Sequence, residues 1–97
     1  MVNFKEGQEV TVSVKTLYDD GVPLEYGSII PDYDENGKLM YYDLYNEDGE
    51  LACCDGETCR IEQVGVALIT LVNNDGESTV RLTLTRPEAE IALFECL

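Results

Sequence analysis

Alternating apolar and polar positions run along the chain and predict short β-strands. In segment 10–15, three valines alternate with Thr11, Ser13 and Lys15, so one face would be buried and the other exposed. Further strands are predicted at 26–33, 38–45, 50–54, 58–64 and 80–85. Segment 66–72 is apolar at nearly every position, which predicts a central strand that is covered on both faces.

Pairs of Asp or Asn followed by Gly separate these segments. They are Asp20-Gly21, Asn36-Gly37, Asp48-Gly49, Asp55-Gly56 and Asp75-Gly76. Such pairs tolerate a positive φ angle and close tight hairpins, so the strands should be antiparallel. Pro31 has no N–H for a sheet ladder and therefore places strand 26–33 at an edge or a bulge.

The end of the chain is predicted to be a short helix. Thr85-Arg86-Pro87-Glu88 reads as a capping box, and an apolar stripe follows at Ala89, Ala92, Leu93 and Cys96. The predicted fold class is mainly β with an α+β character, an antiparallel small barrel or sheet with a C-terminal β-hairpin and one short C-terminal helix. We expect one domain over 1–97, barrel-like over 1–64, with the hairpin and helix over 65–97.

The distribution of charge along the chain indicates which partners the protein can bind. Twenty acidic and six basic residues give a net charge of −14. Residues 19–57 hold twelve acids and one base, Lys38, and so carry −11, against −3 for the rest of the chain. Direct nucleic-acid binding is excluded because it needs cations against phosphates, and an anionic membrane is disfavoured for the same reason. A basic protein, such as a nucleic-acid-binding enzyme, is the favoured partner.

Signatures of enzymes are missing from the sequence. It has no histidine, no Gly-rich phosphate loop and no nucleophile elbow, so we expect neither catalysis nor a cofactor. The chain opens on polar residues, and its apolar runs are too short to span a membrane, which favours a cytoplasmic location. Cys53, Cys54, Cys59 and Cys96 lack zinc-knuckle spacing, so we expect reduced and mostly buried thiols, with a structural zinc as the alternative.

Segment 32–43 fits the ligand spacing of an EF-hand loop. The candidate calcium ligands are Asp32, Asp34, Asn36 and Asp43, with a glycine at the sixth position of the loop. However, Pro31 precedes the loop, and its flanks have no helical periodicity. A hairpin with an acidic tip is therefore the favoured interpretation, and weak calcium binding is the alternative.

Tyrosines and carboxylates are interleaved over residues 18–45, which hold all six tyrosines. Tyrosine packs well in strands, but it is also enriched at binding hot spots, where carboxylates would meet arginine or lysine. On a strand, Asp32 and Asp34 would stand roughly 6.5–7 Å apart, a spacing of the order of successive DNA phosphates. The predicted protein-binding residues are Asp19, Asp20, Asp32, Tyr33, Asp34, Glu35, Tyr41, Asp43, Tyr45, Glu47 and Asp48.

Two resemblances bear on these predictions. Residues 4–12, with Gly27-Ser28-Ile29-Ile30 and Asp48-Gly49-Glu50-Leu51, resemble the strands and tight turn of SH3-like or KOW-like barrels over roughly residues 4–64. Such barrels often bind nucleic acid through basic loops, whereas these segments are acidic. The hairpin at 69–76 resembles one in the small acidic anti-CRISPR proteins that mimic DNA, which implies a phage or mobile-element protein.

Three functions are compatible with the sequence. The first is an acidic inhibitor of anti-CRISPR or anti-restriction type, which presents a nucleic-acid-like carboxylate surface to a basic target. The second is a small-barrel interaction or accessory module without mimicry, and the third is a weak calcium-binding domain. Convergence of the acids of residues 19–57 on one face would favour the first function, and scatter would favour the second.

Overall fold

Over residues 3–21, 23–75 and 78–95, the computed structural model of the chain has two antiparallel sheets and two helices. Its elements are β1 (Glu9–Val12), α1 (Val14–Asp20), β2 (Gly27–Tyr33), β3 (Leu39–Asn46), β4 (Leu51–Cys54), β5 (Thr58–Val64), β6 (Leu68–Asp75), β7 (Ser78–Thr85), α2 (Arg86–Ala92) and β8 (Leu93–Glu95). The mainly β fold class, the C-terminal hairpin β6–β7 and the short helix after it are confirmed. No helix in these ranges is long and apolar enough to cross a membrane.

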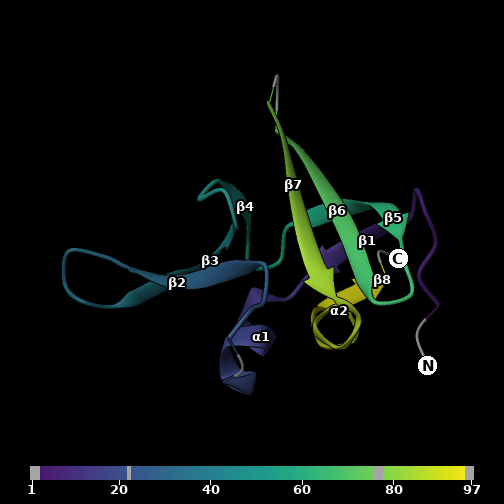
Figure 1. Cartoon of the computed structure of the whole chain (residues 1–97). Helices are drawn as coiled ribbons and strands as arrows, with labels where there is room; N and C mark the ends of the chain where they lie inside the picture. The colour runs from purple at the N-terminus through teal and green to yellow at the C-terminus, as the bar shows by residue number, and fades with distance from the viewer. Residues whose placement is uncertain (1–2, 22, 76–77, 96–97) are drawn as a thin grey trace.

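The strands divide into two sheets (Figure 1). The five-stranded sheet has the order β7-β6-β5-β1-β8, and the three-stranded sheet has the order β2-β3-β4. No closed barrel forms in the described part of the chain, so the sheet is the correct one of the two predicted architectures. Because β5 pairs with β6, the expected boundary between residues 64 and 65 falls inside the five-stranded sheet.

One apolar cluster couples the two sheets. Its members include Val10, Val12, Ile61, Ile69, Leu71, Leu82 and Leu84 of the five-stranded sheet, Leu44, Ala52 and Cys53 of the three-stranded sheet, and Ala89 of α2. Burying a side chain of this size contributes roughly 1.5–3 kcal/mol. As predicted, β6 lies inside its sheet, between β5 and β7, whereas β2 with Pro31 is an edge strand. The prediction that segment 66–72 is covered on both faces is wrong at its start, because Val66 is 96% exposed and the strand begins at Leu68, which is also exposed.

The prediction of a strand over 10–15 is wrong in its second half. Strand β1 ends at Val12, and α1 begins at Val14. The buried residues of α1, Val14 and Leu17, are three positions apart, which matches a helix, but Val14 also continues the alternation of the valines before it. Gly21, with a φ of 74°, ends α1 as a left-handed cap instead of closing a hairpin.

The capping box of α2 is confirmed. The Glu88 N–H donates to Thr85 Oγ1 (3.4 Å), and the Thr85 N–H donates to Glu88 Oε1 (2.9 Å). Ala89 and Ala92 are buried, as the apolar stripe predicts. The helix nevertheless ends at Ala92, because the chain becomes extended at Leu93 and β8 pairs with β1. Cys96, the last residue of the predicted stripe, and Gly76 of the predicted Asp75-Gly76 turn lie outside the described residues.

Gly27 occupies a close approach between β2 and β3. A Cβ atom at this position would overlap the carbonyl oxygen of Tyr45. We therefore expect Gly27→Ala to lower the free energy of unfolding by about 1–2 kcal/mol, because the backbones of the two strands must separate. Urea denaturation measures the effect, with exposed Ser28→Ala as the control. Equal stability of the two variants would contradict the prediction.

Candidate protein-binding surface

The three-stranded sheet has one face that is turned away from the apolar core. Cross-strand partners share a face, and Leu44 points into the core, so its neighbours Asp43 and Tyr45 point outward. The register pairs Ser28 with Tyr45, Ile30 with Asp43, Asp32 with Tyr41, Tyr45 with Leu51, and Asp43 with Cys54. We call these eight residues the outer face.

Large apolar and aromatic side chains are exposed on the outer face. The exposed fractions are 51% for Ile30, 51% for Tyr41 and 46% for Leu51. Scattered apolar residues are ordinary on a protein surface, whereas a group of them on one face is typical of interaction sites. Two further predicted protein-binding residues, Tyr41 and Tyr45, therefore share this face with Asp32 and Asp43, whereas Tyr33 follows Asp32 directly and lies beyond the register shift.

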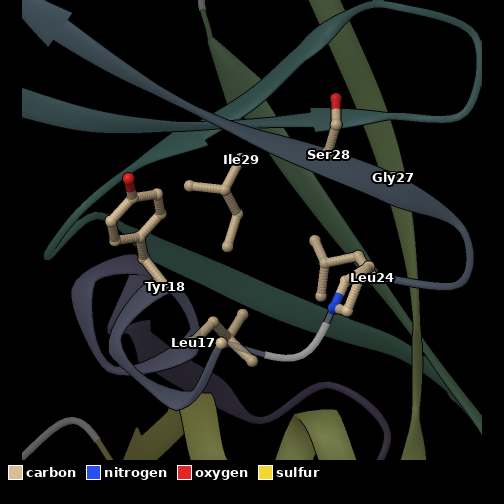
Figure 2. Close-up of a pocket in the computed structure, with 8 residues that line it drawn as sticks. Leu17, Tyr18, Leu24, Gly27, Ser28 and Ile29 are labelled. Carbon is tan, nitrogen blue, oxygen red and sulfur yellow. The ribbon is translucent and has the colours of Figure 1, made fainter.

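The opposite face of the three-stranded sheet packs on α1. Tyr42 contacts the core, and its ring centroid lies 4.8 Å from that of Tyr18. Between α1 and β2 lies an apolar cavity of about 320 Å³, and Figure 2 shows Leu17, Tyr18 and Ile29 around it, with the Ser28 side chain pointing away. Its described lining residues are mainly apolar, with the Tyr18 phenol and the Ser28 hydroxyl as the polar side-chain groups.

The prediction that Asp32 and Asp34 lie on one strand, with their carboxylates on the same face, is wrong. The register shifts between Asp32 and Tyr33, and β2 ends at Tyr33, so Asp34 lies in the hairpin turn. Asp34 Oδ1 accepts the N–H groups of Asn36 (2.9 Å) and Lys38 (2.8 Å), which fixes the turn. The outward carboxylates are instead Asp32 and Asp43, diagonal neighbours roughly 7–8 Å apart.

Segment 32–43 forms a β-hairpin and not an EF-hand. Strands β2 and β3 replace the two helices that an EF-hand requires. Asn36 lies in the turn, whereas Asp43 lies further along β3, opposite Ile30. Within the described ranges, no three Asp, Glu or Cys side chains are grouped closely enough to hold a metal ion. The favoured interpretation, a hairpin with an acidic tip, is therefore the structure of this segment.

The other predicted acids lie around the outer face without joining it. Glu35 is in the β2–β3 turn, Glu47 and Asp48 are in the β3–β4 turn, and Asp19 and Asp20 end α1. Helix α1 lies on the core side of the sheet (Figure 1), so these last two face away from Tyr41. Asp19 forms an ion pair with Lys15 (2.6 Å). The acids of residues 19–57 therefore scatter over several surfaces.

Several carboxylates in this acidic region stabilise the fold. Asp55 Oδ1 accepts the Lys15 N–H (3.0 Å), Glu57 Oε1 accepts the Cys54 N–H, and Glu50 Oε1 accepts from Asn46 Nδ2 (3.1 Å). By contrast, the carboxylates of five predicted binding residues have no hydrogen-bond or ion-pair partner among the described residues. These five are Asp20, Asp32, Glu35, Glu47 and Asp48. They are available to a partner.

The described cysteines are free thiols. Burial, together with a hydrogen bond to Asp43 (3.2 Å), raises the pKa of Cys54 to about 12. A hydrogen bond to Cys59, with burial, raises the pKa of Cys53. Cys53 and Cys54 are thus held as protonated thiols at neutral pH, in which form they are poor nucleophiles and poor metal ligands. Burial of Cys53 agrees with the prediction from sequence.

No family model, curated protein or solved structure matches the chain. The case for a function therefore depends on the outer face itself. The predicted binding residues do not include its apolar members Ile30 and Leu51. The strand period could have found Ile30, because it lies two positions from Asp32.

Proposed function

We propose that this protein binds a basic protein through the outer face and blocks a surface with which that protein binds nucleic acid. The observation that carries the proposal is the placing of exposed Tyr41 and Ile30 beside the outward carboxylates of Asp32 and Asp43. Tyrosine supplies contact area at low entropic cost, and carboxylates supply complementarity to arginine and lysine. Inhibitors of anti-CRISPR or anti-restriction type are the class of protein that this arrangement suits.

Electrostatics supports the same proposal. A net charge of −14, of which residues 19–57 carry −11, attracts basic surfaces and repels nucleic acid. Only three ion pairs occur among the described residues, and two of them, Arg81–Glu62 and Arg86–Glu90, lie outside this acidic segment. Most of the acidic residues in segment 19–57 therefore have no ion-pair partner that offsets their charge, which favours rapid and salt-sensitive association with a basic protein.

An interaction module without mimicry is the second candidate. It is favoured by the scatter of the acids over the two turns and α1. The outer face also contains more large apolar and aromatic side chains than carboxylates, whereas a mimic of nucleic acid needs a regular anionic array. Competition with nucleic acid separates the two functions, because only a mimic must occupy the groove of its target.

The test is binding to a panel of nucleic-acid-binding proteins, with and without duplex DNA as competitor. We expect DNA to displace the protein, and the double variant Asp32→Asn/Asp43→Asn to bind about tenfold more weakly, mainly through slower association. The matched control is Glu90→Gln/Glu95→Gln, which removes the same charge from exposed positions on α2 and β8. Surface plasmon resonance measures the association and dissociation rates of each variant.

Equal weakening by the two double variants would show that net charge alone drives binding, which contradicts the proposal. Binding that DNA does not displace would leave the interaction module as the function.

A further inference from the structure

We infer that the segment of the partner that contacts the outer face presents arginine and not lysine, with a guanidinium group seated on Tyr41 between Asp32 and Asp43. This inference rests on the proposed function and narrows it, because a basic partner alone could use either residue. It depends on how the two carboxylates are arranged about the tyrosine ring.

The position of Tyr41 between the two carboxylates is set by the register. Asp32 is its direct partner on β2, so the two Cβ atoms are roughly 4.5–5.5 Å apart. Asp43 is two residues along β3 on the same face, at roughly 6.5–7 Å. Half of Tyr41 is exposed, and Ile30, the partner of Asp43, is also exposed. The phenol ring of Tyr41 thus has the Asp32 carboxylate beside it on the neighbouring strand and the Asp43 carboxylate further along its own strand.

This arrangement suits a guanidinium group better than an ammonium group. The planar guanidinium stacks on an aromatic ring and keeps its N–H groups in the plane, where they reach carboxylates at the ring edge. Asp32 has no partner among the described residues, so both of its oxygens can accept a bidentate pair. Asp43 Oδ1 accepts a hydrogen bond from the Cys54 thiol (3.2 Å), so the second carboxylate oxygen of Asp43 remains for the guanidinium group. Lysine is a strongly hydrated point charge and gains little from the ring or from Ile30.

The spacing of the carboxylates also limits the partner. Asp32 and Asp43 are diagonal neighbours roughly 7–8 Å apart. Arginines two residues apart on an extended strand have nearly this separation, at roughly 6.5–7 Å. A second copy of this chain does not suit the surface, because each copy carries −14 and the two faces would repel each other. The occupant is therefore an arginine-containing segment of a different protein.

The experiment uses two synthetic peptides that differ only in the basic residue, one with an Arg-X-Arg core and one with Lys-X-Lys. Fluorescence anisotropy with the full-length protein at physiological salt measures both affinities. We expect the arginine peptide to bind at least about tenfold more tightly, which corresponds to about 1.4 kcal/mol. Tyr41→Leu should remove this preference by weakening the arginine peptide alone, and Tyr41→Phe should keep it.

The matched control is Glu47→Gln/Asp48→Asn in the β3–β4 turn, where two unpaired acids lie away from Tyr41. It should weaken both peptides slightly and equally. Circular dichroism checks that every variant is folded. Equal affinity for the two peptides, or a preference that survives Tyr41→Leu, would overturn the arginine inference but leave a basic partner in place. Failure of both peptides to bind would also overturn it, whereas the proposed function is tested separately, with the panel of nucleic-acid-binding proteins and DNA as competitor.

Discussion

Asn46→Asp should lower the free energy of unfolding by about 3 kcal/mol, because it destroys a buried hydrogen-bond network between the two sheets. Asn46 is only 6% exposed. Its Nδ2 donates to the carbonyl oxygen of Arg81 on β7 (2.9 Å) and to Glu50 Oε1 (3.1 Å). Its Oδ1 accepts the N–H groups of Asp48 (3.1 Å) and Glu50 (2.9 Å). The amide thus uses two donors and two acceptor sites.

A carboxylate has nearly the same shape but no donor. In Asn46→Asp an anionic oxygen would face the Arg81 carbonyl and the Glu50 carboxylate, with little water to screen the repulsion. Urea denaturation measures the loss. The matched control is Asn36→Asp, the same substitution at an exposed position of the β2–β3 turn, which should change stability by less than about 0.5 kcal/mol. Similar losses in the two variants would mean that added negative charge, and not the network, is responsible.

Local patterns made much of this fold predictable from the sequence. The bounds of β5 are those predicted from segment 58–64, and β3 and β4 lie within a residue of theirs. The capping box before α2 was equally readable, because both of its partners lie within four residues. Each of these features depends on neighbours in the chain, so periodicity and turn chemistry were sufficient.

Features that depend on distant contacts were not predictable. Two buried positions, Val14 and Leu17, were too few to reveal α1 against the competing valine alternation. The shift between Asp32 and Tyr33 depends on the pairing with β3, and it removed Asp34 from the face that holds Asp32. The division into two sheets depends on β1 pairing with β5 and β8 instead of with β2. Four of the eleven predicted protein-binding residues, Asp32, Tyr41, Asp43 and Tyr45, therefore lie on the outer face, because they precede the shift on β2 or follow the strand period on β3.

Glu88→Ala should lower the free energy of unfolding by about 2–3 kcal/mol, because both carboxylate oxygens of this buried residue accept backbone N–H groups. Oε1 accepts the Thr85 N–H (2.9 Å) at the start of α2, and Oε2 accepts the Glu25 N–H (3.2 Å). The second bond fixes the segment between α1 and β2, so it connects the C-terminal helix to the strand that holds Asp32. Alanine would leave both N–H groups without these acceptors.

Glu90→Ala is the matched control on the same helix. Glu90 is exposed, and its ion pair with Arg86 is long, at 3.9 Å, so its loss should cost less than about 0.5 kcal/mol. Both substitutions remove one negative charge and introduce the same helix-favouring residue, which cancels net charge and helix propensity from the comparison. Thermal and urea unfolding of the pair measure the difference. If Glu90→Ala were as destabilising as Glu88→Ala, the capping box and the contact with Glu25 would contribute nothing beyond the charge of the helix.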